Sequence, residues 1–82
     1  MKSALQQLKA DVTAQLGGKD VRIRAGRVEV QQDYFYHPTG GFEGWLSEVQ
    51  KALCSGFRIV DSWDFFRPWP KRSYMMAVVD RV

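Results

Sequence analysis

The sequence predicts a single α+β domain, residues 1–82, in which two helices pack on one face of an antiparallel sheet. Two segments, 3–16 and 42–55, carry apolar residues three or four positions apart, the spacing of a helix with one buried side. Four other segments have the alternating or continuously apolar pattern of strands. Glycine and proline residues separate these segments, so the predicted order is helix, strand, strand, helix, strand, strand.

The first helix is predicted from a capping signal, an apolar stripe and a stop signal. Ser3 and Gln6 have the spacing of a capping box, in which each side chain satisfies a free backbone N–H group. The apolar stripe comprises Leu5, Leu8, Val12 and Leu16. Gly17 and Gly18 end the helix, because glycine adopts the left-handed conformation without strain.

A β-hairpin is predicted from Asp20 to about Tyr36. A two-residue turn at Ala25-Gly26 pairs Arg22 with Glu29 on one face. The same register gathers four aliphatic side chains on the other face: Val21, Ile23, Val28 and Val30. Ala-Gly is not the preferred sequence for such a turn, which leaves a longer loop open as an alternative.

The second helix, about 42–55, follows the break at 37–41 and is terminated by Gly56. Its stripe contains Phe42, Leu46, Val49 and Leu53. Two strands follow, about 57–66 and 73–82, joined by a proline-containing loop. Alternation places Trp63 and Phe65 on the same face as Phe57 and Ile59. Asp61 falls on that face too; a bulge or an edge position that turns it outward is favoured over pairing with Arg58 or Arg81.

Composition limits the class of protein. The net charge of +3, with an acidic middle between two basic ends, gives only a weak attraction for polyanions. The lone cysteine, Cys54, excludes an intramolecular disulfide framework and favours a cytoplasmic location. On the last turn of an apolar helix, it is predicted to be a small buried hydrophobe. No segment approaches the ~20 apolar residues needed to cross a bilayer, so no membrane contact is predicted.

The chain offers little material for catalysis. His37 and Cys54 lack the spacing of metal ligands, and no glycine-rich phosphate loop is present, so neither a metal nor a cofactor is predicted. The weak catalytic candidates are His37 and Asp33, which share one side of the strand if it continues through residue 37. A histidine that merely ends a strand beside a proline turn is the favoured interpretation, and the balance is against an enzyme.

The segment 63–72 stands out because it holds four aromatic residues and three cations. The candidate binding residues in it are Trp63, Phe66, Arg67, Trp69, Lys71 and Arg72. One interpretation is structural, with Trp63 and Phe65 in the core and Trp69 as a lid. The second is contact with another protein, since tryptophan and arginine dominate binding hot spots. The third is nucleic acid, with bases stacked on the rings and Arg22, Arg24 and Arg27 as a secondary basic patch.

The function predicted from these features is a small, non-catalytic binding or assembly module. It is predicted to form a homodimer or to bind another protein through the aromatic and basic surface at 63–72. The reason is that the chain has more aromatic side chains than a small core can bury, and the remainder are expected to lie in an interface. The alternative is a small nucleic-acid-binding protein that uses the 66–72 loop and the arginines of the first hairpin.

Overall fold

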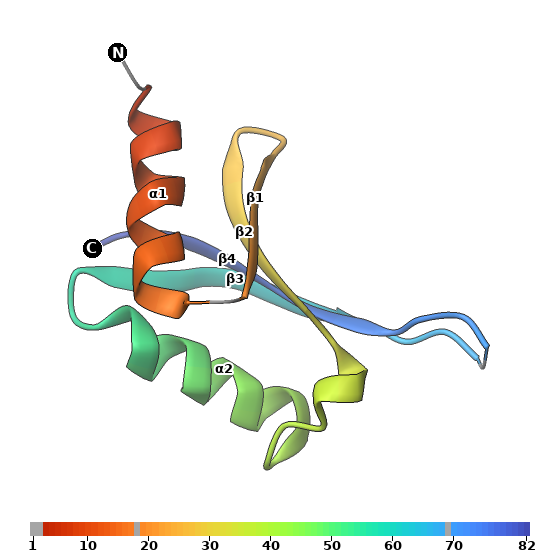
Figure 1. Cartoon of the computed structure of the whole chain (residues 1–82). Helices are drawn as coiled ribbons and strands as arrows, with labels where there is room; N and C mark the ends of the chain where they lie inside the picture. The colour runs from red at the N-terminus through yellow and green to blue at the C-terminus, as the bar shows by residue number, and fades with distance from the viewer. Residues whose placement is uncertain (1–2, 18, 69) are drawn as a thin grey trace.

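The computed structural model describes residues 3–17, 19–68 and 70–82, and it confirms the predicted order of elements (Figure 1). The elements are α1 (Ala4–Leu16), β1 (Asp20–Arg24), β2 (Arg27–Asp33), a 3-10 turn η1 (Tyr34–Tyr36), α2 (Gly41–Leu53), β3 (Phe57–Phe65) and β4 (Tyr74–Arg81). The dimensions are 43 × 24 × 21 Å, and the long axis reflects the β3–β4 hairpin, which extends past both helices (Figure 1).

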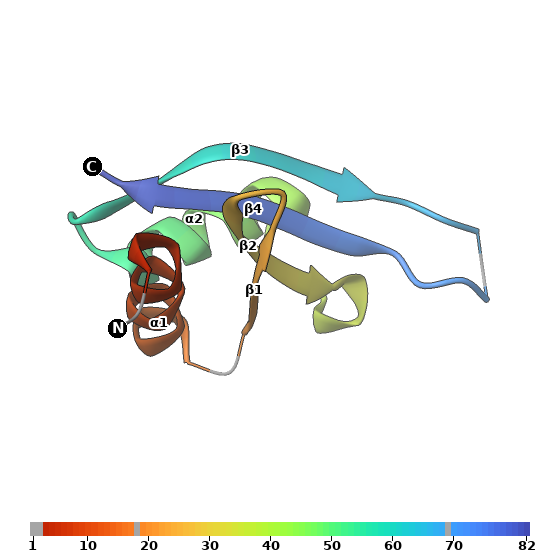
Figure 2. The same ribbon diagram turned by 90° about the horizontal axis from the view of Figure 1, so that it is seen from above.

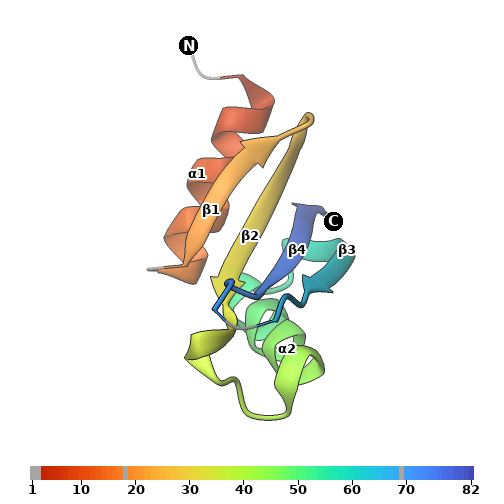
Figure 3. The same ribbon diagram turned by 90° about the vertical axis from the view of Figure 1, so that its right-hand side faces the viewer.

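The four strands form one antiparallel sheet in the order β1-β2-β4-β3. This order, which the sequence pattern does not determine, puts β4 between β2 and β3 (Figures 2 and 3). Both helices pack on one face of the sheet, as predicted, and no described element covers the opposite face. We call this opposite side the open face.

Helix α1 forms as the sequence predicts. The side chain of Ser3 accepts a hydrogen bond from the N–H of Gln6, whose own side chain accepts one from the N–H of Ser3, so the capping box is complete. Leu8, Val12 and Leu16 are buried. The helix ends at Gly17, which has a positive φ of 38°. The second half of the predicted stop signal, Gly18, lies outside the described residues.

The first hairpin has the predicted register, with Ile23 opposite Val28 and Val21 opposite Val30. The turn is the short one, because Ala25 and Gly26 both have positive φ, 52° and 73°. Positive φ at both central residues matches the right-handed twist of the flanking strands. The pairing of the strands therefore imposes on Ala25 a conformation that alanine rarely adopts.

Strand β2 ends three residues earlier than predicted, and this is a correction. The carboxylate of Asp33 accepts a hydrogen bond from the N–H of Phe35 at 2.8 Å, which turns the chain into the 3-10 turn Tyr34–Tyr36. His37 then takes a left-handed conformation with φ 51°. The extended geometry that would set Asp33 and His37 on one side of a strand is therefore wrong.

Helix α2 buries Trp45, Val49 and Leu53, but it stops two residues before the predicted end. Cys54 terminates it with a positive φ of 62°, in the position expected of Gly56. The prediction of a buried Cys54 is wrong, since its side chain is exposed. Because the backbone leaves the helix at Cys54, the side chain of Cys54 no longer lies on the apolar stripe of α2.

Strand β3 contains the bulge favoured for Asp61, between Ile59 and Asp61. The extra residue, Val60, shifts the alternation, so that Asp61 lies opposite Val78 and Trp63 opposite Met76. The shift also moves Trp63 and Phe65 from the helix-covered face to the open face. Their predicted place beside Phe57 and Ile59 is therefore wrong, and so is the interpretation that both belong to the core.

The outer edge of β3 is partly closed by a side chain of α2. Gln50 donates from Nε2 to the carbonyl of Phe57 at 3.1 Å, and its Oε1 accepts from the N–H of Ile59 at 3.2 Å. Both backbone groups lie on the outer edge of β3, where a further strand would bond them. The amide of Gln50 thus occupies two of the hydrogen-bonding groups of this edge.

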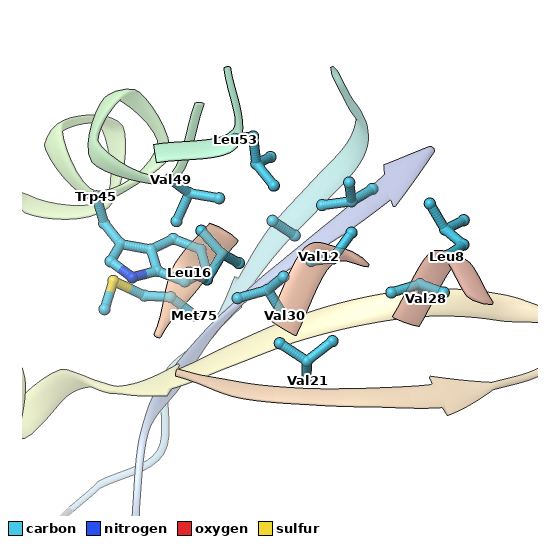
Figure 4. Close-up of a cluster of buried hydrophobic side chains, with 12 residues drawn as sticks. Leu8, Val12, Leu16, Val21, Val28, Val30, Trp45, Val49, Leu53 and Met75 are labelled. Carbon is cyan, nitrogen blue, oxygen red and sulfur yellow. The ribbon is translucent and has the colours of Figure 1, made fainter. Parts of the chain in front are cut away.

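The hydrophobic core lies between the helices and the sheet. In Figure 4 the labelled side chains of both helices point toward those of β1, β2 and β4. The buried cluster consists of Leu8, Val12, Leu16, Val21, Val28, Val30, Trp45, Val49, Leu53, Met75, Ala77 and Val79. Each helix therefore uses the apolar stripe that its sequence predicts, and Trp45 is the largest fully buried side chain among the described residues.

Candidate binding surface on the open face of the sheet

Cross-strand pairing determines which side chains the open face presents. Three rows cross the strands: Asp20–Gln31–Met76–Trp63, Arg22–Glu29–Val78–Asp61 and Asp33–Tyr74–Phe65. Residues directly opposite one another share a face and have neighbouring side chains. The open face therefore carries its aromatic side chains on β3 and β4 and most of its charged side chains on β1 and β2.

Side chains from all four strands surround a hollow of about 390 Å³, which we call the sheet-face pocket. It is lined by Arg22, Arg24, Glu29, Gln31, Trp63, Phe65, Tyr74 and Met76. The volume falls within the range of about 300–1,000 Å³ that is usual for small-molecule sites. One wall of the pocket is aromatic and the other is polar.

The aromatic wall consists of two nearly parallel rings and a guanidinium group that is similarly close to both. The rings of Phe65 and Tyr74 are nearly parallel, 15° apart, with centroids separated by 5.4 Å. The guanidinium of Arg67 lies over both rings, 5.4 Å from Phe65 and 5.7 Å from Tyr74. Two hydrogen bonds across the loop help to hold Arg67, from its Nε to the carbonyl of Arg72 and from its N–H to Oγ of Ser73. The two rings and the guanidinium are thus a preformed aromatic cluster that carries a positive charge.

A buried carboxylate belongs to the polar wall. Glu29 is only 3% exposed, and its Oε1 accepts no hydrogen bond from any described residue. Nε of Arg24 lies 3.3 Å away, close enough for an ion pair but not aligned as a hydrogen bond. A buried acceptor without a donor costs about 1–3 kcal/mol. Such a group in a native structure calls for an explanation.

The arginines of the first hairpin, predicted as a secondary basic patch, each have an acidic neighbour. Arg22 pairs with Asp20, and Arg24 with Glu29. Arg27 reaches across the open face to Asp61, with Nη2 2.9 Å from Oδ2. The pairs of Arg22 and Arg27 are exposed on both partners, and such pairs contribute only about 0–1 kcal/mol. These two arginines therefore stay able to exchange their partners for an anion from solution.

The end of the β3–β4 hairpin forms a second, smaller hollow of about 200 Å³, which we call the tip hollow. It is lined by Asp33, Tyr34, Phe35, His37, Phe66, Arg67, Lys71, Arg72 and Ser73. The rings of Tyr34 and Phe66 are in contact there, with centroids 4.8 Å apart. The predicted binding residues thus separate, with Trp63 in the sheet-face pocket and Phe66, Arg67, Lys71 and Arg72 around the tip hollow. The sixth, Trp69, lies outside the described residues.

The two weak catalytic candidates, His37 and Asp33, both line the tip hollow, but the carboxylate of Asp33 contacts groups other than the imidazole of His37. One of its oxygens accepts the hydrogen bond from Phe35 that forms the 3-10 turn, and the other lies 3.9 Å from Nη1 of Arg72. A carboxylate that orients a catalytic histidine would direct an oxygen at the imidazole. The geometry therefore gives Asp33 a role in the backbone turn and in an ion pair.

Tyr34 joins the tip hollow to strand β3. Its hydroxyl donates a hydrogen bond to Oδ2 of Asp64 at 2.6 Å. Desolvation by partial burial, followed by the hydrogen bond to Asp64 and the charge of Asp64, raises the pKa of Tyr34 to about 12. All three causes favour the neutral phenol over the phenolate. Folding therefore holds a proton on Tyr34 that the unfolded chain releases at lower pH.

This proton gives a testable pH dependence. The folded pKa lies above the value of 10.0 for a free tyrosine, so the contribution of Tyr34 to stability is complete below pH 10 and is lost as the pH rises toward 12. A near-ultraviolet titration of phenolate absorbance is expected to contain a component near pH 12 that Tyr34→Phe removes and Asp64→Asn shifts downward. Unchanged titration of Asp64→Asn would contradict the assigned hydrogen bond.

Sequence reasoning missed most of the sheet-face pocket, in particular Glu29, Gln31 and Tyr74. Glu29 and Gln31 alternate with buried valines, and this pattern predicts polar side chains on the solvent-facing side of a hairpin. The signal for the aromatic wall of the pocket was Asp61, a charged residue at a position where the alternation of the strand predicts an apolar one. Once a bulge is assumed there, alternation alone moves Trp63 and Phe65 to the face that carries Glu29.

Two kinds of site do not form among residues 3–17, 19–68 and 70–82. No group of three or more histidine, cysteine, aspartate or glutamate side chains is gathered there in a way that would hold a metal ion. In the same residues, neither helix has both the length and the apolar character required to span a membrane.

Comparison with protein-family models, with curated proteins and with solved structures gave no match. Function must therefore be argued from the chemistry of the open face and of the hairpin end.

Proposed function

We propose that this chain is a non-catalytic binding module that holds single-stranded nucleic acid along the open face of its sheet. The observation that carries the proposal is the stack of Arg67 over Phe65 and Tyr74 beside the sheet-face pocket. Proteins that bind single strands pair aromatic rings, on which bases stack, with a positive groove that follows the backbone. An open sheet face leaves the unstacked bases free to reach the rings, which a duplex would not permit.

The charges beside the rings support the same partner. Arg67, Lys71 and Arg72 follow one another around the hairpin end, and the only acidic partner of Arg72 is 3.9 Å away among the described residues. At the opposite end of the face, Arg22 and Arg27 are held by ion pairs that are exposed on both partners. Phosphates compete well with such pairs, since binding also releases condensed counterions from the nucleic acid.

The proposal is tested by titrating the protein with short single-stranded and double-stranded oligonucleotides while following tryptophan emission at low and at physiological salt. We expect quenching by single strands, with affinity that falls steeply as salt rises. The double substitution Arg67→Ala and Arg72→Ala is expected to weaken binding to every sequence and to reduce the logarithmic salt slope by about 1.4.

The matched control removes two positive charges elsewhere. Lys9 and Lys51 are exposed residues of α1 and α2, on the opposite side of the sheet. Lys9→Ala with Lys51→Ala is expected to leave affinity within about twofold of the native value. Absence of quenching at low salt, or an equal loss in both double variants, would contradict the proposal.

A second candidate is self-association or contact with another protein through the hairpin end. It is favoured by two neighbouring phenylalanines of the tip hollow, because Phe66 is 74% exposed and Phe35 is 66% exposed. Large exposed aromatic side chains are typical of protein contacts. Light scattering that gives a dimer mass for the native chain and a monomer mass for Phe66→Ala, without any effect of oligonucleotides, would favour this candidate over the first.

A further inference from the structure

The sheet-face pocket has a carboxylate on one wall and aromatic rings on the other, and this difference indicates which chemical class of ligand it binds. The buried Oε1 of Glu29 is a hydrogen-bond acceptor that no described residue satisfies, and Glu29 lines the pocket. Nε of Arg24 lies 3.3 Å from this oxygen as an ion pair, and an N–H or O–H donor that enters from outside would supply the aligned hydrogen bond that Arg24 does not. A ligand that supplies it recovers the cost of the unpaired carboxylate, which makes the contact selective as well as favourable.

The rest of the pocket restricts the shape of this donor. Trp63, Tyr74 and Phe65 contribute aromatic side chains to the lining, which favours a flat aromatic ligand. Arg22 and Arg24 stand beside Glu29 at the polar wall and offer donors of their own. The ligand therefore presents donors to the carboxylate and acceptors or an anion to the arginines. A simple organic cation does not fit, because the guanidinium of Arg24 already lies beside the carboxylate of Glu29.

We propose that the sheet-face pocket binds one guanine base, with its Watson–Crick edge on the carboxylate of Glu29. This inference rests on the proposed function and specifies which base the open face selects. Guanine alone among the four bases carries two adjacent donors on that edge, N1–H and the N2 amino group, which match the two oxygens of a carboxylate. Its O6 and N7 are the acceptors that arginine prefers.

The other bases fit the same groups less well. Adenine and cytosine each offer one amino group next to a ring nitrogen that carries a lone pair, so one carboxylate contact is replaced by repulsion. Thymine and uracil have a single N–H between two carbonyl groups, both of which face a carboxylate unfavourably. The order of preference is therefore guanine first and thymine or uracil last.

The test compares the native protein with oligothymidylates of equal length that differ only at the central base. We expect about tenfold tighter binding with a central guanine than with thymine, within the range usual for a good bidentate contact. A central hypoxanthine, which lacks only the N2 amino group, is expected to lie between them. Equal affinity for the guanine and thymine strands would overturn the inference and leave the proposed function standing.

Substitution of Glu29 tests the proposed contact between the guanine base and the carboxylate. Glu29→Gln keeps the shape of the side chain but offers only one acceptor oxygen, and we expect it to remove the guanine preference, so that strands with a central guanine and a central thymine bind equally well. Glu43→Gln is the control, since Glu43 is an exposed residue in the first turn of α2, on the helix side of the sheet. Retention of the full preference in Glu29→Gln would overturn the assignment.

Free nucleotides separate this inference from the proposed function. Titration with guanosine and uridine monophosphates, again by tryptophan emission, is expected to give saturable quenching with the former only. If guanosine monophosphate binds and no oligonucleotide does, the pocket is a site for a free guanine nucleotide and the proposal of a strand-binding surface fails. If neither binds, the inference fails whatever the oligonucleotides do.

Discussion

Replacing Trp45 with alanine is expected to lower the free energy of unfolding by about 3–5 kcal/mol, a large share of the stability of a small domain. The ring is fully buried between α2 and the sheet, beside Met75 (Figure 4). Its Nε1 donates to Oε1 of Gln32 at 2.7 Å, so the polar end of the indole is also satisfied. Alanine leaves a cavity and removes that donor.

The matched control for Trp45→Ala is Trp63→Ala. Trp63 is partly exposed on the open face, so part of its ring already contacts solvent in the folded protein, and we expect a smaller loss of about 1 kcal/mol. Urea unfolding followed by circular dichroism measures both variants without relying on the lost fluorophore. Equal losses would contradict the assignment of one tryptophan to the core and the other to the surface.

Gly44→Ala is expected to destabilise the protein by about 2–3 kcal/mol, although alanine is the better helix former. A Cβ at Gly44 would stand 1.8 Å from the carbonyl oxygen of Thr39 and 2.8 Å from its carbonyl carbon. Both are backbone atoms, so no side-chain rotation relieves the contact. The loop before α2 must move, although it is held by the hydrogen bond from Gly41 N–H to the carbonyl of Pro38.

Gly56→Ala provides the comparison, because an added Cβ there meets no described atom within 4 Å. Removing a glycine at an unstrained position restricts the unfolded chain, so we expect no loss and a gain of up to about 1 kcal/mol. Thermal unfolding of the two variants side by side is the measurement. A Gly44→Ala protein as stable as Gly56→Ala would mean that Thr39 does not approach the helix as closely as described.

The helices and the first hairpin could be predicted because their signals are local. The capping box at Ser3 and the apolar stripe of α1 lie within one stretch of chain, and the alternation around Ala25-Gly26 fixes its own register. The end of β2 could not be predicted from alternation, because the bend depends on one hydrogen bond from the Phe35 N–H to the side chain of Asp33. The exposure of Cys54 likewise follows from a single backbone angle.

The candidate site was only partly predictable, because it depends on strands that are distant in sequence. Segment 63–72 was identified from composition, but its division between two hollows follows from the bulge at Val60 and the central place of β4. Glu29 is a candidate only because the strand order brings Met76 of β4 and Trp63 of β3 to the same face of the sheet. No pattern within β2 distinguishes a buried glutamate from a solvated one.

The amide of Gln50 at the outer edge of β3 has a consequence for behaviour at high concentration. An unpaired strand edge is a template on which another chain can extend the sheet, and repeated addition leads to aggregates. Here the two backbone groups at Phe57 and Ile59 are already occupied by a side chain of the same molecule. An incoming strand must first displace that amide, which makes extension of the sheet at this point of the edge less favourable.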